Sequence, residues 1–188
     1  MNGPLDTSLL DKAILFAVRA HAGTERRGKG FPYIVHPMEA MAIASTMTAD
    51  QEILAAAALH DVVEDTAVTL DEIRNQFGDR IAQLVDTESD HFEQGTDWRA
   101  RKEASLLRLK EATYDEKIVA LGDKLSNMRA IARDYITMGE VFWDRFHVKE
   151  KSVHGWRYHA LLDALSDLSD TYAYQEFDFL VNRIFPTD

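Results

Sequence analysis

The sequence predicts an all-α protein, and three observations support this fold class. Apolar residues recur at spacings of three and four along most of the chain, which is the period of an amphipathic helix. Capping residues and glycines stand where these periodic segments begin and end. No convincing run of alternating β-branched residues is present, so no sheet is expected. At typical helix and loop lengths the chain has room for roughly eight to ten helices.

Length and composition predict one globular domain. The chain has 188 residues, of which 46% are hydrophobic and 28% are charged, and this is ordinary for a folded domain. We therefore expect a single domain over residues 1–188. Within it, helices from 140–188 are expected to pack on a core that spans about residues 9–133.

The first sixty residues contain three expected helices and one loop. Apolar residues recur at helical spacing from Leu9 to about Ala22. Residues 24–32 combine glycines, a proline and three cations, which indicates an irregular basic loop. Pro37 stands where a second helix begins, because proline is tolerated in the first helical turn. The run 53–59 is nearly all Ala and Leu and predicts a helix that is buried on most sides.

Caps and glycines mark the later helices. Thr69 and Glu72 form a capping box that opens a short helix, and Gly78 is expected to end it. A polar stretch at 88–95 predicts a loop. The remaining helices are expected over 81–85, 98–112, 115–138, 156–168 and 175–184.

Charge and cysteine content exclude several classes of function. With 21 Lys and Arg against 32 Asp and Glu, the net charge is −11, which argues against a nucleic-acid partner. An anionic ligand must therefore meet a local basic patch. The absence of Cys excludes disulfides, thiolate metal sites and a cysteine nucleophile. Residues 1–20 lack the pattern of a signal peptide and no segment approaches a membrane span, so we expect a cytoplasmic protein without a membrane partner.

Metal-competent side chains follow the Ala-rich run. His60 and Asp61 are adjacent there, and burying an imidazole beside a carboxylate is costly unless something pairs with them. A divalent cation would do so. On a continuing helix Glu64 and Asp65 lie one turn further along, which adds two carboxylates to the adjoining faces.

Other parts of the chain offer further ligands. Asp123 and Asn127 are one helical turn apart, and His36 immediately precedes a proline. Two imidazoles and two carboxylates form a mixed N/O site that suits Mn, Fe, Zn or Mg. Such a site activates water for hydrolysis, and Glu64 and Asp65 would then orient or deprotonate that water.

Five separate segments also carry a resemblance to a known family. They read Ala-His-Ala-Gly at 20–23, Arg-Arg at 26–27, Pro-Tyr-Ile-Val-His-Pro at 32–37, Leu-His-Asp-Val-Val-Glu-Asp-Thr at 59–66 and Asp-Lys-Leu-Ser-Asn-Met-Arg at 123–129. In this order they resemble the HD-domain phosphohydrolases, and more narrowly the hydrolase domain of the RelA/SpoT alarmone enzymes. The chain looks like a free-standing small alarmone hydrolase of the Mesh1-like kind, which implies a single HD-type helical bundle.

The resemblance implies roles for individual residues. The family's metal ligands, which usually hold manganese, are matched by His36, His60, Asp61 and Asp123. The acidic pair that activates water is matched by Glu64 and Asp65. Positions that bind phosphates or line the nucleotide pocket are matched by Arg26, Arg27, Lys29, Asn127 and Arg129. The implied reaction removes the 3′-pyrophosphate of ppGpp or pppGpp and gives GDP or GTP and pyrophosphate.

Three departures from the family pattern stand out. The basic loop is one residue longer than the common form, so the choice between Arg26 and Arg27 as the phosphate ligand stays open. Residues 87–91 replace a lysine of the relatives with histidine. Gly122 stands where alanine is more usual, and this predicts slightly looser helix packing beside Asp123.

Other functions remain as alternatives. The same residues are also compatible with an HD phosphohydrolase whose substrate is ppApp, a 5′-nucleotide or the 2′-phosphate of NADPH. A non-catalytic sensor and a purely structural helical protein are less favoured, because they leave the acidic pair or the buried polar residues unexplained. Aromatic residues after position 140 are interpreted as helix-packing core, with a face for a homo-oligomer left open.

Overall fold

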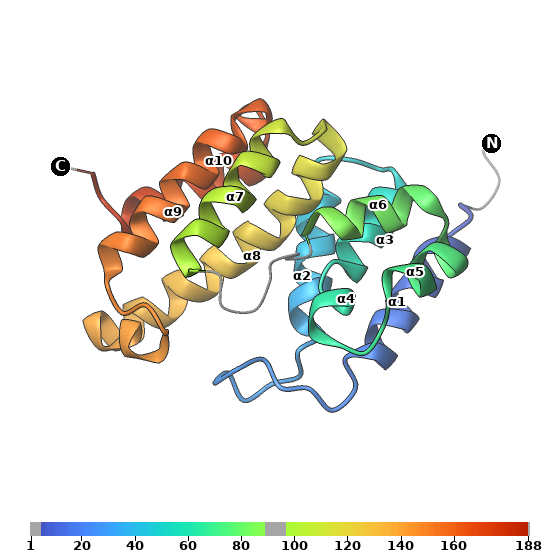
Figure 1. Cartoon of the computed structure of the whole chain (residues 1–188), viewed down its shortest axis with the longest axis horizontal. Coiled ribbons are helices and arrows are strands. Elements are labelled where there is room, and N and C mark those ends of the chain that lie inside the picture. Colours follow the sequence, from blue (N-terminus) through green and yellow to red (C-terminus); the bar gives the residue numbers. More distant parts are fainter. Residues whose placement is uncertain (1–4, 89–96, 188) are drawn as a thin grey trace.

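The computed structural model describes residues 5–88 and 97–187, and the chain is helical throughout these ranges (Figure 1). Ten α-helices and two 3₁₀ helices occur there. In chain order they are α1 (Ser8–Ala20), α2 (Val35–Ala44), α3 (Gln51–Leu59), α4 (Val62–Asp65), α5 (Leu70–Phe77), α6 (Asp79–Glu88), α7 (Trp98–Glu111), α8 (Tyr114–Met138), η1 (Gly139–Arg145), α9 (Lys151–Ala164), η2 (Ser166–Leu168) and α10 (Tyr172–Ile184). The described ranges contain no strand, only an isolated bridge between Glu25 and Pro32, so the all-α prediction is confirmed.

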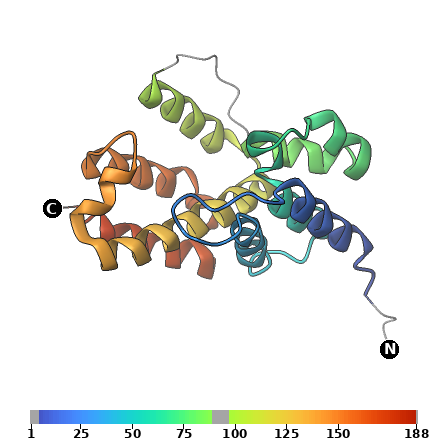
Figure 2. The same ribbon diagram turned by 90° about the horizontal axis from the view of Figure 1, so that it is seen from below.

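The long helix α8 organises the fold. It packs against α2, α3 and α6 on one side and against α10 and η1 on the other. Figures 1 and 2 show α8 in yellow, crossing the middle of the molecule between the earlier helices and α9 and α10. A capping box of Thr113 and Glu116 starts this helix and Gly139, at φ 62°, ends it. Residues on α8 therefore reach both groups of helices.

Helix α3 is the buried element that the Ala-rich run predicts. Every residue from Ile53 to Leu59 is buried, and α3 packs against both α1 and α2. Asp50 caps its start by accepting a hydrogen bond from the backbone N–H of Glu52 at 2.9 Å. The small alanine side chains place the end of this helix, and the histidine that follows it, in the interior of the protein.

A close approach of two helices lies beside Asp123. A Cβ built on Gly122 of α8 would lie 2.7 Å from the carbonyl oxygen of Ala40 on α2. The expectation of looser packing at Gly122 is therefore wrong. The glycine lets the backbones of α2 and α8 approach more closely than alanine would permit, and this brings their functional side chains together.

Some boundaries differ from those expected from the sequence. Helix α3 ends at Leu59 and α4 begins only at Val62, so the helix does not continue through His60 and Asp61. The first helical hydrogen bond of α4 runs from the N–H of Asp65 to the carbonyl of its N-cap residue Asp61 at 2.9 Å. The predicted loop at 88–95 begins within α6, and residues 89–96 lie outside the described ranges. In the described part of the chain, no helix has both the length and the apolar character that crossing a bilayer requires.

Candidate metal centre and adjoining cavity

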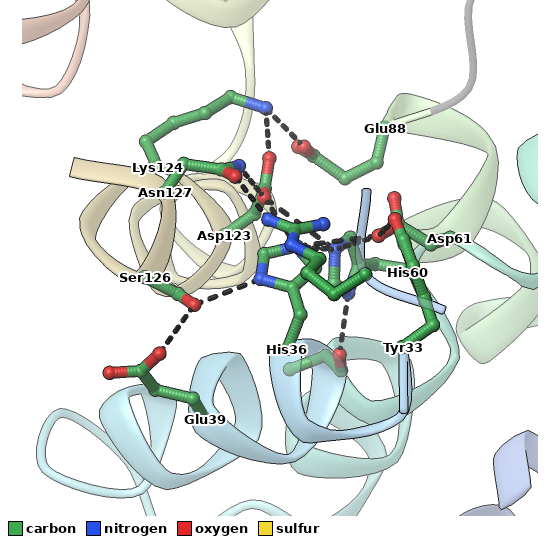
Figure 3. Close-up of polar contacts among 12 residues, drawn as sticks. Tyr33, His36, Glu39, His60, Asp61, Glu88, Asp123, Lys124, Ser126 and Asn127 are labelled. Atoms are coloured by element: carbon green, nitrogen blue, oxygen red, sulfur yellow. Dashed lines mark hydrogen bonds and ion pairs between the residues drawn. The ribbon is translucent and has the colours of Figure 1, made fainter. Parts of the chain in front are cut away.

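Four predicted ligands meet in the interior of the protein (Figure 3). His36 lies in the first turn of α2, His60 and Asp61 lie between α3 and α4, and Asp123 lies on α8. The Nε2 atoms of His36 and His60 are 3.3 Å apart. Asp61 Oδ2 lies 3.3 Å from His36 Nε2 and 3.0 Å from His60 Nε2, and Asp123 Oδ1 lies 3.1 and 3.6 Å from the same two atoms.

This donor set fits a divalent cation. Ligand atoms of His36, His60 and Asp61 all lie within 4.8 Å of one another, and Asp123 reaches both imidazoles. The side chains of both histidines are almost fully buried. Two imidazoles and two carboxylates that converge without water are costly unless a cation or a proton lies between them. The mixed N/O chemistry suits Mn, Fe, Zn or Mg.

The ring of His60 is oriented by the backbone. Its Nδ1–H donates to the carbonyl oxygen of Ala57 at 2.8 Å, which directs Nε2 toward the two aspartates. Burial opposes the charged imidazolium, yet the Asp61 and Asp123 carboxylates raise the pKa of His60 well above its usual range. A positive charge is therefore favoured at Nε2, whether a proton or a metal ion supplies it.

The two carboxylates are held in the ionised form. Burial opposes the charge on Asp61, but the adjacent imidazole of His60 holds its pKa far below the usual range. Burial also opposes the charge on Asp123, where the ammonium group of Lys124 lowers the pKa. Lys124 Nζ donates to Asp123 at 2.6 Å and to Glu88 at 2.8 Å. Ionised carboxylates in the interior are the form that a cation requires.

Tyr33 adds a hydrogen bond that the sequence did not single out. Its hydroxyl donates to Asp61 Oδ2 at 2.7 Å, and burial together with the charge of Asp61 raises the pKa of Tyr33. The ring of His21 lies against Tyr33 with centroids 4.8 Å apart, and burial lowers the pKa of His21. Tyr33 is thus a neutral donor that orients one carboxylate of the centre.

The acidic pair lies next to the centre on α4. Glu64 and Asp65 are both exposed, three and four residues after Asp61. The Asp65 carboxylate is near enough to contribute to the raised pKa of Tyr33, after burial and Asp61. Their predicted part in activating water stays a prediction, and the geometry places at least Asp65 on the Tyr33 side of the centre.

A cavity of about 640 Å³ adjoins the centre. It is bordered by Tyr33, Lys124 and Asn127, each of which donates a hydrogen bond to Asp61 or Asp123. Its cationic lining comprises Arg26, Arg27, Lys29, Lys124, Arg145 and Arg157. Asp134 is the single carboxylate among the described residues that line it. This is the local basic patch that an anionic ligand of an acidic protein requires.

The predicted cations of the loop take different positions. Arg26 donates to the side-chain oxygen of Asn127, and its guanidinium lies 5.0 Å from the centre of the Tyr33 ring. Lys29 forms an ion pair with Asp134. Arg27 lines the cavity, and no described carboxylate lies within ion-pair distance of it. All three loop cations and Asn127 therefore border the same cavity. Their part in binding phosphates or a nucleotide stays a prediction.

Arg129 does not line this cavity. Its guanidinium pairs with Glu176 at 2.6 Å and with Glu39 at 3.2 Å, and it borders a separate cavity of about 220 Å³. The expectation that it lines the nucleotide pocket beside Asn127 is wrong. Two positions along an α-helix turn a side chain by about 200°, so Arg129 faces away from the side that carries Asn127.

Several residues of the site were missed from the sequence. Tyr33 and Ser126 lie inside the motifs that carry the family resemblance, so a search for partners of the ligands would have found them. Arg145 and Arg157 lie after the motif core, in η1 and α9, where no local pattern indicates a ligand. The expectation that the aromatic residues after position 140 form core holds for Phe142, Trp143, Tyr158 and Phe177, which are buried, and is wrong for Tyr172 and Phe179, which are 73% and 60% exposed. Phe142, Phe146 and Tyr158 also line the cavity.

The fold and the site together define a class of protein. A chain that is helical throughout its described ranges and brings two histidines and two aspartates from α2, from the turn after α3 and from α8 to one buried centre is a helical protein with a His/Asp cluster that could hold a metal ion. The HD domain family model matches residues 13–138, and the chain belongs to this family.

Curated relatives match over the same region. The chain is 34% identical over 131 residues to "GTP pyrophosphokinase rsh" of Brucella ovis, which covers 68% of this chain and 17% of that protein. It is 35% identical over 125 residues to "Guanosine-3′,5′-bis(diphosphate) 3′-pyrophosphohydrolase" of Haemophilus influenzae, covering 62% of this chain and 18% of that protein. These names confirm the predicted resemblance. The chain spans less than a fifth of the length of these relatives.

Two solved structures are similar along most of the chain. One, described as "A metazoan ortholog of SpoT hydrolyzes ppGpp and plays a role in starvation responses", has a TM-score of 0.77 at 21% identity, covering 96% of this chain and 98% of that one. A crystal structure of a Listeria monocytogenes protein has a TM-score of 0.73 at 25% identity, covering 81% of this chain and 99% of that one. The first of these likenesses concerns the fold alone.

Proposed function

We propose that this chain is a metal-dependent hydrolase that removes the 3′-pyrophosphate of ppGpp or pppGpp. The observation that carries the proposal is a buried His/Asp centre that opens onto a cavity lined by six cations. The curated relatives include guanosine-3′,5′-bis(diphosphate) 3′-pyrophosphohydrolases, and this supports the same reaction.

His36, His60, Asp61 and Asp123 would hold the metal ion, and we propose Mn²⁺ as the ion. When bound, such an ion polarises a phosphoryl oxygen and makes water a better nucleophile at neutral pH. Tyr33 donates to Asp61 Oδ2, the same oxygen that faces the two imidazoles, and so fixes its position. Lys124 binds Asp123 Oδ2, which leaves Asp123 Oδ1 facing the imidazoles.

Glu64 and Asp65 would accept the proton of the attacking water. The water oxygen bonds to the phosphorus that carries the ribose 3′ oxygen, the bond between that oxygen and phosphorus breaks, and pyrophosphate leaves. The acidic pair passes that proton on to the 3′ oxygen, which becomes a hydroxyl group, and the second proton of the water leaves with the pyrophosphate or to solvent. The exposure of both carboxylates on α4 leaves them accessible to water beside the centre.

The cavity would receive the rest of the nucleotide. Its volume of about 640 Å³ is in the usual range for a site of a small ligand. Arg27 and Arg157 line it without a described carboxylate partner, so their charges are available for phosphate oxygens. Phe142, Phe146 and Tyr158 offer apolar surface for the base and ribose.

The test is to incubate metal-stripped protein with ppGpp and ppApp in parallel, with and without Mn²⁺, and to separate the products by anion-exchange chromatography. We expect Mn²⁺-dependent release of pyrophosphate, and the relative rates identify the base. Release of orthophosphate, or no product from either compound, would contradict the proposal and direct attention to a phosphomonoester such as NADPH.

Paired variants connect the reaction to the acidic pair. Glu64→Gln and Asp65→Asn are expected to lower turnover by about 10²-fold or more, since general-base catalysis contributes 10²–10⁴-fold. Asp71→Asn, at an exposed carboxylate on α5 in a surface ion pair, is the matched control and should leave turnover unchanged. A sensor that only binds the nucleotide would bind it equally well in all three variants and show no turnover in the wild type.

A further inference from the structure

A chain of polar contacts runs from His36 away from the metal centre, buried at His36 and Ser126 and partly exposed at Glu39. His36 Nδ1 lies 2.9 Å from Ser126 Oγ, and Ser126 Oγ donates to Glu39 Oε2 at 2.8 Å (Figure 3). His36 is 4% exposed and Ser126 is 2% exposed. The contacts connect α2 with α8 on the side of His36 that is remote from Asp61.

The direction of each hydrogen bond in this chain follows from the number of protons. A serine hydroxyl has one hydrogen, and an ionised carboxylate offers only acceptors, so the hydrogen of Ser126 goes to Glu39. Ser126 Oγ must then accept from Nδ1–H of His36. A neutral imidazole with its proton on Nδ1 carries its lone pair on Nε2. That atom faces Asp61 and Asp123 at 3.3 and 3.1 Å.

Glu39 is itself held in place by a second layer of charge. Its Oε1 accepts from Arg129 Nη1 at 3.2 Å, which leaves Oε2 for Ser126. Arg129 is anchored to Glu176 on α10 by two hydrogen bonds of 2.7 and 2.6 Å. Glu176, followed by Glu39, raises the pKa of Arg129. This explains what Arg129 does in a motif in which Lys124 and Asn127 line the cavity.

We propose that Ser126 and Glu39 are positioning residues that set the tautomer of His36, with Arg129 fixing the Glu39 carboxylate. The inference rests on the metal site of the proposed function and is independent of the substrate. The two histidines of the centre are then oriented by different means. His60 uses the carbonyl oxygen of Ala57, whereas His36 uses side chains that mutation can remove.

Replacing Glu39 by glutamine gives a sharp test, because it reverses the hydrogen bonds. Arg129 would take the amide oxygen, so the amide NH₂ would face Ser126 and donate to its Oγ. The serine hydrogen would then go to Nδ1 of His36, and the imidazole proton would move to Nε2. Glu39→Gln should therefore weaken metal binding more than Ser126→Ala, which leaves Nδ1 without a partner but forces no reversal.

The experiment measures two quantities on the purified full chain. The first is the dissociation constant for Mn²⁺ and Zn²⁺ by titration calorimetry, and the second is the tautomer of His36 from ¹⁵N chemical shifts of the metal-free protein. We expect Ser126→Ala to weaken metal binding by about 10-fold and Glu39→Gln by about 100-fold, in the range known for partners of metal ligands. The ¹⁵N spectrum of Glu39→Gln should show the proton on Nε2.

Matched controls separate positioning from folding. Glu103→Gln makes the same chemical change in a surface ion pair with Arg99 on α7, outside this network, and should bind metal within about twofold of the wild type. Ser126→Thr keeps the hydroxyl and should restore most of the affinity that Ser126→Ala loses. Thermal unfolding of each metal-free variant reports any loss of structure.

Two results would overturn the inference. One is metal affinity within twofold of the wild type in both Glu39→Gln and Ser126→Ala, with His36 still protonated on Nδ1. The other is a wild-type chain that binds neither Mn²⁺ nor Zn²⁺. A chain that shows the expected affinities but does not hydrolyse ppGpp would support the relay and refute only the proposed substrate.

Discussion

The metal centre and the cationic lining of the cavity are built in opposite ways. At the centre, His36 and Asp123 come from α2 and α8 and His60 from the turn after α3; these residues are at most 8% exposed and have partners for their polar atoms. In the lining, Arg27 and Arg157 come from a loop and from α9, and no described carboxylate neutralises them. The centre has its partners within the protein, whereas these two cations need counter-charge from a ligand. The difference separates residues that organise the chemistry from residues that select what is bound.

Removing a ligand at the centre should have the largest effect. Asp61→Asn loses a charge that both imidazoles and Tyr33 contact, so we expect loss of stoichiometric Mn²⁺ and a fall in ppGpp hydrolysis of about 10³-fold or more. Metal analysis and a product assay measure both. Asp71→Asn on α5 is the control, and full metal content in Asp61→Asn would contradict the assignment of this ligand.

Neutralising the unpaired cations of the cavity lining should change substrate binding without changing the metal centre. For Arg157→Ala and Arg27→Ala we expect a KM for ppGpp that rises by about 10-fold or more, since a hydrogen bond to a charged group contributes about 1.5–3 kcal/mol. We expect kcat and the dissociation constant for Mn²⁺ to stay within about threefold. Steady-state kinetics and calorimetry distinguish the two. Arg183→Ala, at an exposed position on α10, should change neither.

A parallel fall in kcat and in metal affinity for Arg157→Ala would break the comparison. It would mean that Arg157 and the metal centre are energetically coupled, so that substrate binding and metal binding are not separate.

A change in backbone spacing should test how strictly the centre is built. In Gly122→Ala the new Cβ would meet the carbonyl oxygen of Ala40 at 2.7 Å, and backbone cannot move aside as a side chain does. We expect a loss of about 1–3 kcal/mol in the free energy of unfolding, together with weaker Mn²⁺ binding. Urea denaturation and calorimetry measure these effects. In the control Gly155→Ala the Cβ meets only the side chain of Phe185 at 3.3 Å, so its effect should be smaller.

The smallest effect is expected at the start of the helix that leads to His60. Asp50 caps α3 and pairs with Arg80 at 2.8 Å, and the hydrogen bond from Arg80 lowers the pKa of Asp50 below 3.8. Asp50→Ala should cost about 1 kcal/mol at pH 7. Because the folded pKa is lowered, this contribution is present above the ordinary value of 3.8 and is lost as the pH falls below it. Urea denaturation at pH 7 and pH 3 should therefore show a smaller difference between wild type and variant at pH 3.

The sequence indicates the centre far better than its surroundings. The Ala-rich run before His60 predicts burial, and burial of a histidine beside Asp61 predicts a compensating charge. Capping residues likewise predict the start of the helix at Thr69, since a cap acts within one turn. These inferences depend on neighbours in the chain, and the structure agrees with them.

Long-range contacts account for what the sequence did not reveal. Arg129 donates to Glu39 and Glu176, which belong to helices distant from it in the sequence. Its position in the motif alone therefore does not show toward which neighbouring helices its side chain points. The turn at His60 that ends α3 is a local feature, but its consequence is a long-range contact: it places His60 beside Asp123 of α8. Arg157 joins the cavity only because α9 folds back beside it.

The length of the uninterrupted helix α8 fixes the distance between two parts of the site. Asp123 of the centre and Asp134 of the far cavity wall belong to the same uninterrupted helix, with Asn127 between them. At 1.5 Å per residue, the two ends are about 16 Å apart along the helix axis. A ligand must therefore match that span to contact both ends at once, and shorter or longer molecules lose one of the two contacts.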